Sequence, residues 1–236
     1  MKIVITGASS GIGRALSENI LKYKEKAKVV GVGRNSEALR ELKSVYGERF
    51  EYVIADLTDM SDVYRVVNSV VDFLGTVDVL VNNAGFGVYK ELLNHSDEDI
   101  YNLLKVNFIA PIILSRELVK YMNRGSVIVN VLTAGIYVLM RKLPIYGASK
   151  FGLHYVTNVM RHELKDKGIK VISVFPGIIN TEFHKRAGIN YIRGGASADS
   201  VAKAIIKAIE RGGKEVYVPG YLRILKILGP KLIPFT

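Results

Sequence analysis

The sequence predicts an α/β fold in which helices cover both faces of a parallel β-sheet. Short runs of β-branched residues alternate with longer segments of helical periodicity along the whole chain. The runs are almost continuously apolar, as at residues 126–131 and 171–174, which is typical of strands buried on both faces. At 236 residues, of which 49% are hydrophobic, the chain can bury a full core, and no break in composition divides it.

The runs with strand character are residues 2–6, 28–33, 50–54, 77–81, 126–132, 169–174 and 215–218. The segments of helical periodicity are residues 14–24, 36–46, 59–74, 97–122, 146–167 and 198–211. Ser197 is an N-cap candidate for the last helix. This alternation predicts a doubly wound, mostly parallel sheet of seven strands, in which ligands bind at the carboxyl ends of the strands.

A glycine-rich turn joins the first predicted strand to the first predicted helix. Gly7, Gly11 and Gly13 have the spacing G-x-x-x-G-x-G, which differs from the G-x-G-x-x-G dinucleotide fingerprint. Glycines let the backbone approach a ligand closely, and the free N–H groups at the start of a helix suit a phosphate. Taken alone, the segment is consistent with a phosphate site and equally with a plain structural turn.

Tyr146 and Lys150 are four residues apart in a predicted helix, so they share one helix face. A nearby ammonium favours the tyrosinate and would move the tyrosine pKa from about 10 toward the range useful for acid–base catalysis. The alternative is a surface helix that happens to carry both residues. The pair is therefore a candidate for proton transfer.

Composition excludes several kinds of site. The chain has no cysteine, which excludes disulfides, thiol catalysis and cysteine-ligated metals, and the histidines at 95, 154, 162 and 184 have no ligand spacing. We therefore expect no metal. The net charge of +11 is not gathered into an aromatic-interleaved cluster, so nucleic acid is not an expected partner. No signal peptide is recognisable, and we expect a cytoplasmic protein.

Further motifs follow the later strands. Asn82-Asn83-Ala84-Gly85 follows the fourth strand, and Pro176-Gly177 with Thr181 follows the sixth. With the glycine turn and Tyr146-x-x-x-Lys150, these motifs stand in the order found in the classical short-chain dehydrogenases and reductases, and the chain resembles that family from Met1 to about Thr181. The resemblance implies one Rossmann-like domain over residues 1–236 that binds a nicotinamide dinucleotide and transfers a hydride.

The resemblance also implies catalytic roles. Tyr146 would exchange a proton with the substrate oxygen, and Lys150 would bind the nicotinamide ribose and favour the tyrosinate. Asn107 matches the family asparagine that holds a water linking the lysine to solvent. Its alternative is a structural side chain that bridges backbone groups.

Thr133 departs from the family pattern, which has a serine thirteen residues before the tyrosine and three before a glycine. Counting back from Tyr146 reaches Thr133, whereas counting back from Gly135 reaches Leu132. The chemistry requires a hydroxyl that donates to the carbonyl oxygen as negative charge develops there, and leucine cannot donate. We therefore assign Thr133 as the fourth catalytic residue.

The end of the second strand carries Arg34 and no acidic residue. An acidic side chain would favour NAD(H), whereas Arg34 can pair with a 2′-phosphate, so we expect NADP(H) as the preferred cofactor and NAD(H) as a possible one. Ser10 stands where many phosphate-preferring relatives have a second basic residue. By resemblance, Asp56 would accept from the adenine amine. The full set of expected cofactor-binding residues is Gly7, Ser9, Ser10, Gly11, Ile12, Gly13, Arg34, Asp56, Leu57, Asn83, Ala84, Gly85, Tyr146, Lys150, Pro176, Gly177, Ile179 and Thr181.

Three segments bear on the substrate. Residues 183–195 resemble the family's lid, and the apolar loop at residues 136–140 suggests a hydrophobic wall, which favours a lipophilic carbonyl or alcohol over a sugar. Residues 221–236 form an apolar tail with a narrow basic stripe, too short to span a bilayer. Three readings of the tail stay open: it closes the site or packs on a partner subunit, it lies on a membrane surface, or it is loosely ordered.

Two classes of function follow. The first is an NADPH-dependent carbonyl reductase or alcohol dehydrogenase acting on a hydrophobic ketone, aldehyde or secondary alcohol, with a membrane-surface lipid ketoreductase as a variant. The second is a cofactor-binding sensor or scaffold without turnover. By resemblance, we expect a homodimer or homotetramer that pairs the helices at residues 97–122 and 146–167.

Overall fold

The computed structural model describes residues 1–189 and 194–232, and its centre is a seven-stranded sheet in the order β3-β2-β1-β4-β5-β6-β9. All neighbouring strands of this sheet run parallel. The predicted doubly wound sheet is confirmed. Its strands are β1 (Lys2–Thr6), β2 (Lys28–Gly33), β3 (Phe50–Ile54), β4 (Val79–Asn82), β5 (Val127–Val131), β6 (Lys170–Pro176) and β9 (Glu215–Val218).

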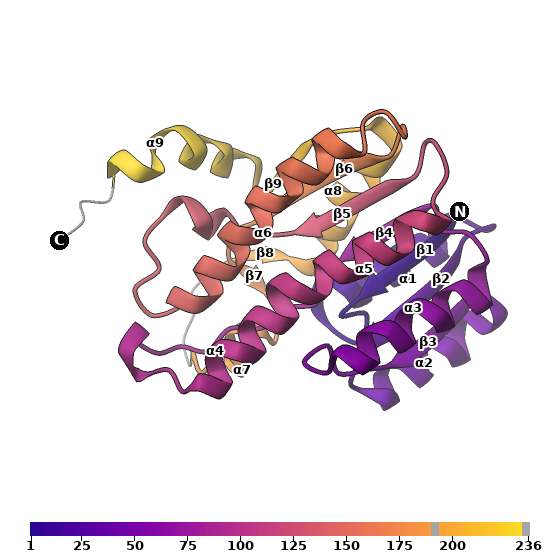
Figure 1. Cartoon of the computed structure of the whole chain (residues 1–236), viewed down its shortest axis with the longest axis horizontal. Coiled ribbons are helices and arrows are strands. Elements are labelled where there is room, and N and C mark those ends of the chain that lie inside the picture. Colours follow the sequence, from indigo (N-terminus) through magenta and orange to yellow (C-terminus); the bar gives the residue numbers. More distant parts are fainter. Residues whose placement is uncertain (190–193, 233–236) are drawn as a thin grey trace.

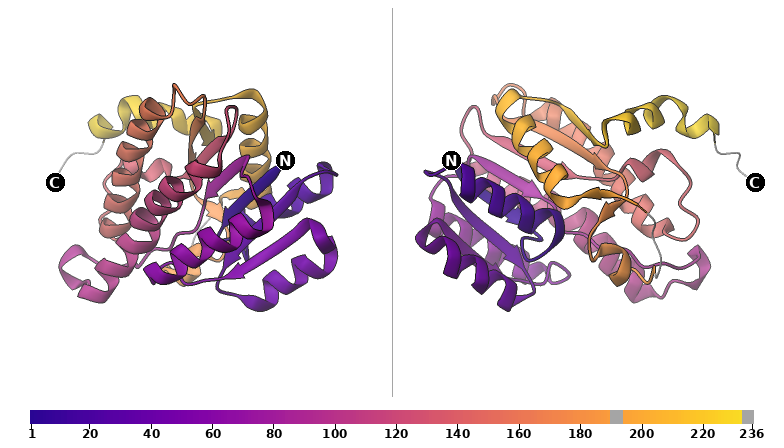
Figure 2. Two further views of the ribbon diagram at one scale, coloured as in Figure 1. Left: turned by 45° about the vertical axis from the view of Figure 1, so that its right-hand side comes forward. Right: turned by 180° about the vertical axis from the view of Figure 1, so that it is seen from behind.

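Helices cover both faces of the sheet (Figure 1). Along the chain they are α1 (Gly11–Tyr23), α2 (Ser36–Tyr46), α3 (Met60–Leu74), α4 (Asp97–Leu104), α5 (Ala110–Leu118), α6 (Pro144–Glu163), α7 (Phe183–Arg186), α8 (Ala198–Arg211) and α9 (Leu225–Leu232). Figure 2 shows α1 and α8 side by side on the face opposite α5 and α6. The strands β7 (Ile179–Asn180) and β8 (Ala196–Ser197) form a separate small pair.

The core is divided into two layers by the alternation of side chains along each strand. Ile3 and Ile5 of β1 pack in the cluster that contains Leu16 of α1 and Ile205 of α8. Val4, between them, packs in the opposite cluster with the valines of α3 and with Leu114 of α5. Because both faces are buried, these strands read as continuous apolar runs.

The largest difference from prediction lies in the segment 97–122, which was expected to be one uninterrupted helix. A π-helical turn at Lys105–Ile109 separates α4 from α5, and Asn107 lies inside it. Helix α6 starts earlier than predicted, at Pro144, and ends earlier, at Glu163. A π turn widens the helix locally and often marks a functional site, and helical periodicity alone does not reveal it.

Candidate active site

The predicted motifs meet at the carboxyl edge of the sheet, around the neighbouring strands β1 and β4. β1 ends at Thr6 and passes into the glycine turn, and β4 ends at Asn82 and passes into Asn83-Ala84-Gly85. Strand order reverses here, because β2 and β3 lie on one side of β1 while β4, β5 and β6 lie on the other. Such a switch point is the usual ligand-binding place of a doubly wound sheet.

The glycine turn packs tightly against Asn83. Gly7 has a φ of +70°, and a Cβ placed on Gly13 would lie 2.2 Å from the Gly7 carbonyl oxygen and 2.7 Å from Asn83 Nδ2. The Asn83 amide donates to the Thr6 carbonyl at 2.9 Å. These contacts require glycine at positions 7 and 13 and fix the turn over the end of β4.

The start of α1 fits an anionic group. Ser10 is the N-cap and makes no side-chain capping bond, and the first turn of the helix carries no acidic residue. The backbone of Arg14 donates to the Ser10 carbonyl as the first bond of the helix, so the N–H groups of Gly11 and Ile12 point out of its end. A dinucleotide pyrophosphate is the kind of group that this turn would hold.

Thr6 belongs to this arrangement although the sequence analysis did not single it out. Its hydroxyl oxygen accepts the backbone N–H of Asn83 at 3.0 Å and that of Ala84 at 2.9 Å, and it donates to the Val81 carbonyl at 3.4 Å. Thr6 therefore clamps the end of β4 to the end of β1. The signal available in the sequence was a hydroxyl residue at the last position of the strand, directly before Gly7.

Tyr146 lies in the first turn of α6, and Lys150 follows one turn later, as predicted. The Lys150 ammonium is 3% exposed and donates to the Val131 carbonyl at 2.9 Å. Burial lowers the pKa of Lys150 to about 8. The amine is thus anchored to the end of β5, and burial destabilises its charged form.

The pKa of Tyr146 shifts in the direction opposite to the predicted one. Burial raises it to about 12, and a hydrogen bond with the Thr133 hydroxyl opposes this rise only in part. The expected stabilisation of the tyrosinate by Lys150 is not among the causes of the shift, and desolvation of the phenolate decides its direction. Tyr146 therefore holds its proton at neutral pH.

Thr133 lies beside Tyr146. Its hydroxyl accepts the Gly135 N–H at 3.1 Å and donates to the Pro176 carbonyl at 3.4 Å, and it is near enough to Tyr146 to influence the pKa of the phenol. Leu132, the alternative reached by counting from Gly135, is 2% exposed and packs in the core with Phe175. The geometry thus brings the hydroxyl of position 133, and not the side chain of position 132, to the tyrosine.

Asn107 is fully buried and pairs with the backbone of Phe86. Its Oδ1 accepts the Phe86 N–H at 3.0 Å, and its Nδ2 donates to the Phe86 carbonyl at 2.9 Å. A Cβ placed on Gly85 would lie 2.9 Å from Asn107 Oδ1 and 3.2 Å from Lys150 Nζ. The side chain therefore holds the loop after β4 next to the lysine, and a water relay through Asn107 remains a prediction.

Arg34 and Asp56, expected at the adenosine end, form an ion pair of 3.5 Å. Burial raises the pKa of Asp56, but hydrogen bonds from Thr58 and the nearby Arg34 outweigh it, so the net shift is downward. Asp56 is thus held as a carboxylate. The Leu57 side chain packs in the core, which leaves only its backbone for a ligand. A Cβ on Gly33 would lie 3.0 Å from Ser9 Oγ, so the glycine turn reaches this corner.

The segment after β6 closes the other side of the glycine turn. A Cβ placed on Gly11 would lie 3.3 Å from Thr181 Cγ2, and Thr181 Oγ1 accepts the Phe183 N–H at 3.4 Å. Ile179 is buried in the core and belongs to β7. Gly177 is covered by Leu222, whose Cδ1 would lie 2.5 Å from a Cβ at that position.

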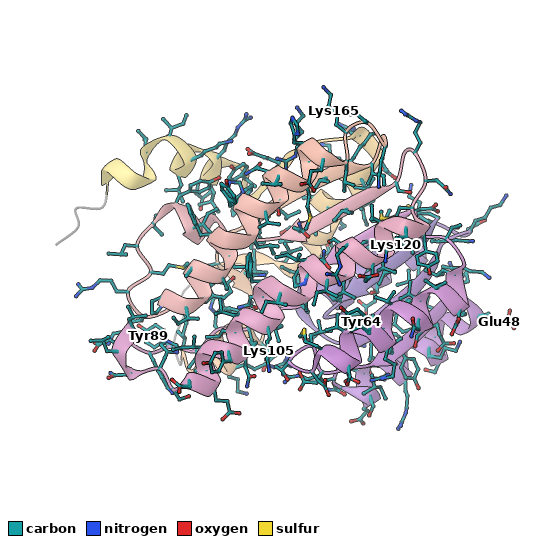
Figure 3. All side chains as sticks on the ribbon, viewed as in Figure 1. Glu48, Tyr64, Tyr89, Lys105, Lys120 and Lys165 are labelled. Atoms are coloured by element: carbon teal, nitrogen blue, oxygen red, sulfur yellow. The ribbon has the colours of Figure 1, made fainter. Side chains whose placement is uncertain are left out.

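The first part of the predicted lid lies over Tyr146. The rings of Phe183 and Tyr146 are 5.2 Å apart and inclined at 55°, and a Cβ placed on Gly87 would lie 3.2 Å from Phe183 Cζ and 3.1 Å from Leu143 Cδ2. The backbone of Tyr89 donates to the Ala187 carbonyl at 2.8 Å, and Figure 3 shows Tyr89 at the end of the molecule that holds α4 and α7. Residues 190–193 of the predicted lid 183–195 lie outside the described part of the chain.

The loop 136–140, predicted to form a hydrophobic wall, contributes through one of its side chains. Met140 lies between Gly135 and Gly147, with its Cε 2.9 Å from a Cβ placed on Gly147. Ile136 and Tyr137 pack instead with the core cluster of Leu132 and Phe175. These two side chains therefore belong to the core. Around Tyr146, Phe183 packs on its ring, Met140 lies against the next residue, Gly147, and Leu143 lies against Gly87 beside Phe183.

The tail has an inner face that packs on the protein. Leu222 covers Gly177, and a Cβ on Gly229 would lie 2.2 Å from the Tyr137 carbonyl oxygen. Lys226 donates to both carboxylate oxygens of Glu215, at 2.8 Å and 3.0 Å. Residues 233–236 of the predicted tail lie outside the described range. Within residues 1–189 and 194–232, no helix is both long enough and apolar enough to cross a bilayer.

Comparisons with known proteins agree with this arrangement. The family profile described as short chain dehydrogenase matches residues 1–191. An uncharacterized oxidoreductase of Staphylococcus epidermidis is 28% identical over 87% of this chain and 89% of that protein. The ketoacyl reductase HetN of Nostoc is 31% identical over 92% of this chain and 77% of its own length.

A similar solved structure is the short-chain dehydrogenase from Sphingobium yanoikuyae in complex with NADPH. It has a TM-score of 0.85 and 26% identity, and the match covers 98% of this chain and 93% of that one. The matched region includes the glycine turn, Asn83-Ala84-Gly85, Tyr146 and Lys150. The chain therefore belongs to the short chain dehydrogenase family of NAD(P)-binding oxidoreductases.

Proposed function

We propose that the protein is an NADP-dependent carbonyl reductase, working also in reverse as an alcohol dehydrogenase, on hydrophobic ketones, aldehydes or secondary alcohols. One observation carries the proposal: the Thr133 hydroxyl lies close enough to the Tyr146 hydroxyl to oppose the rise of its pKa, and both residues lie at the carboxyl edge of the sheet, with the buried Lys150 one helical turn after Tyr146. A site that only senses a cofactor has no need of two hydroxyls that converge on one point.

The glycine turn and the neighbouring strand ends would hold the cofactor. The N–H groups at the start of α1 would take the pyrophosphate, Arg34 the 2′-phosphate, Asp56 the adenine amine, and Lys150 the nicotinamide ribose. The NADPH bound by the Sphingobium relative supports this preference. NAD(H) is a second cofactor in the proposal for two reasons. Arg34 is already paired with Asp56, and position 10 is a serine that adds no positive charge for a 2′-phosphate.

The bound nicotinamide would supply the hydride that reduces the carbonyl carbon. Tyr146 would donate its proton to the carbonyl oxygen, and the high pKa of the free tyrosine suits this acid role. Thr133 would donate a hydrogen bond to the same oxygen as its negative charge grows. Lys150, charged at neutral pH and placed beside the ribose, would stabilise the tyrosinate that remains, and Asn107 would hold the loop after β4 in place.

The hydrophobic substrate class rests on the side chains around Tyr146. Met140, Leu143 and Phe183 present a thioether, an isobutyl group and a phenyl ring, and none of them can hydrogen-bond a sugar hydroxyl. The name of the related Nostoc protein, a ketoacyl reductase, supports a ketone as the reacting group. We also propose a homodimer or homotetramer and a cytoplasmic location.

The variant Tyr146→Phe distinguishes a carbonyl reductase from a cofactor-binding sensor without turnover. This variant removes only the phenolic oxygen, so NADPH oxidation with a panel of aromatic and aliphatic aldehydes and ketones is expected to disappear while NADPH binding, followed by fluorescence, is retained. Tyr155→Phe is the matched control, because Tyr155 lies on the same helix and is 70% exposed. Undiminished turnover in Tyr146→Phe would refute the mechanism, and a wild-type protein that binds NADPH without turning over any of the panel would favour the sensor.

A further inference from the structure

Arg186 reaches from the lid to the glycine turn. It is the last residue of α7, and its Nη1 donates to Ser10 Oγ at 3.4 Å, although the two residues are 176 positions apart in the chain. Ser10 is the N-cap of α1 and does not use its own side chain for capping. A guanidinium therefore lies at the start of the helix whose N–H groups suit a phosphate.

This guanidinium is available for a ligand. Arg186 is exposed, and it takes part in none of the salt bridges found among residues 1–189 and 194–232. Arg34 differs in this respect, because Asp56 pairs with it. An arginine without a carboxylate partner keeps further N–H donors for an anion besides the one that contacts Ser10.

The end of β2 and the lid both reach the glycine turn, at neighbouring residues. A Cβ placed on Gly33, the residue before Arg34, would lie 3.0 Å from Ser9 Oγ, and Arg186 contacts the next residue, Ser10. Ser9-Ser10 thus lies between the end of β2 and the lid. A 2′-phosphate held by Arg34 at the end of β2, as proposed above, would lie at this corner of the turn.

The same single helical turn carries both Arg186 and the ring that covers Tyr146. Phe183 and Arg186 are three residues apart on α7, with Phe183 5.2 Å from the Tyr146 ring and Arg186 at Ser10. A contact at one end of so short a helix restricts the position of the other end. Helix α7 therefore connects the start of α1 to the ring that lies over Tyr146.

We propose that Arg186 is a specificity-determining residue that pairs with the adenosine 2′-phosphate, in the place of the basic residue missing at position 10, and that this pairing holds Phe183 over Tyr146. The inference rests on the proposed function, since it concerns the cofactor of that reaction. If Arg186 pairs with the 2′-phosphate, part of the preference for NADPH over NADH comes from the lid. Loss of the arginine should then affect binding of NADPH, and closure of the lid in the NADPH complex, far more than binding of NADH.

The experiment compares wild type with Arg186→Ala, Arg186→Lys and Lys185→Ala. Lys185→Ala is the matched control, because it removes the same charge from the same turn without a contact to Ser10 within the described chain. Dissociation constants are measured by fluorescence for NADPH and NADH, and by calorimetry for adenosine 2′,5′-bisphosphate and ADP. The KM of one carbonyl substrate is measured with each cofactor.

Arg186→Ala is expected to weaken NADPH and the 2′,5′-bisphosphate about tenfold, as for loss of one charge-assisted pair, and to leave NADH and ADP within about twofold. Arg186→Lys should recover part of the loss, and the carbonyl KM should rise with NADPH only. An equal loss for NADPH and NADH would place the arginine on the pyrophosphate and overturn the inference, as would unchanged affinities. A wild-type protein that bound neither dinucleotide would instead overturn the proposed function.

Discussion

The Phe183 ring lies against the Tyr146 ring, with a centroid distance of 5.2 Å, and the tip of the same ring lies 3.2 Å from a Cβ placed on Gly87. Phe183 of α7 thus lies between Tyr146 of α6 and the loop after β4. Removing the Phe183 ring exposes this face of Tyr146.

Phe183→Ala is expected to raise the KM for an aromatic or long-chain ketone about tenfold or more, because a buried phenyl contact is worth roughly 1–3 kcal/mol. Phe183→Leu should restore most of the loss, since it keeps an apolar side chain of similar reach. Steady-state kinetics with acetone and with a long-chain ketone measure the effect. An equal rise in KM for the two substrates would argue against an apolar contact.

Thr133→Val is expected to lower kcat for carbonyl reduction about 10²–10³-fold, which is typical of the loss of one donor to a developing oxyanion. Valine has nearly the same shape but no hydroxyl, so NADPH affinity should stay unchanged. Thr133→Ser keeps the donor and should remain active. A fully active Thr133→Val enzyme would remove Thr133 from the mechanism.

Lys150→Met is expected to be more stable than wild type at pH 7. The pKa of Lys150 falls from its ordinary value of 10.5 to about 8 on burial, so below pH 8 the folded protein carries a desolvated charge. At roughly 1.4 kcal/mol per pKa unit this costs about 3 kcal/mol, of which the lost hydrogen bond to Val131 would offset about 1 kcal/mol.

The sign of the pH dependence follows from the same shift. Between about pH 8 and 10.5 the unfolded lysine binds more protons than the folded one, so the stability of wild type rises with pH, and the advantage of Lys150→Met should shrink. Urea midpoints at pH 7.5, 8.5 and 9.5 measure the difference. If the difference in urea midpoint between the two proteins did not change with pH, it would contradict a lysine whose charged form is destabilised by burial.

Tyr155→Glu is expected to produce a smaller species in light scattering. Phe151, Tyr155 and Val159 lie at four-residue spacing on α6 and are 58%, 70% and 40% exposed, so they form an apolar stripe on the helix face. A charge in its centre would oppose pairing with a second subunit. Tyr23→Glu is the control, because Tyr23 is 62% exposed at the end of α1. A wild-type protein that is monomeric at high concentration would contradict the expected oligomer.

The roles of the two faces of the tail, the inner one that packs on the protein and the exposed outer one, should be separable by mutation. Leu222→Ala removes packing from Gly177 and is expected to cost about 1–2 kcal/mol of stability and to raise the KM for cofactor. The double variant Ile224→Ser and Ile227→Ser changes side chains that are 54% and 70% exposed, and should leave both quantities unchanged.

Liposome sedimentation then tests the membrane reading of the tail. Wild type, the double serine variant and a chain lacking residues 221–236 are mixed with vesicles of phosphatidylglycerol and phosphatidylcholine. If the tail acts only through its inner face, the three proteins should partition equally. Release of the serine variant from the vesicles would show that the outer face binds lipid.

Much of the site was visible in the sequence because its motifs follow strand ends. Once parallel strands alternate with helices, residues just after β1, β4, β5 and β6 must meet at one edge of the sheet. Asn83 and Thr133, which follow the ends of β4 and β5, could therefore be grouped from the sequence alone, and Tyr146 could be added only through its motif with Lys150. Thr6 could not, because its two bonds to the backbone after β4 depend on the register of β1 beside β4, which local sequence does not encode.

By itself, the sequence determined the seven strands, the alternating layers and the family, since periodicity and ordered motifs are local properties of the chain. Only the tertiary structure decided the rest. Burial reversed the expected pKa shift of Tyr146, a π turn interrupted the long helix at Asn107, and packing across the chain brought Arg186 to Ser10. These depend on what surrounds a group in space, and desolvation and side-chain reach are set by neighbours far away in sequence.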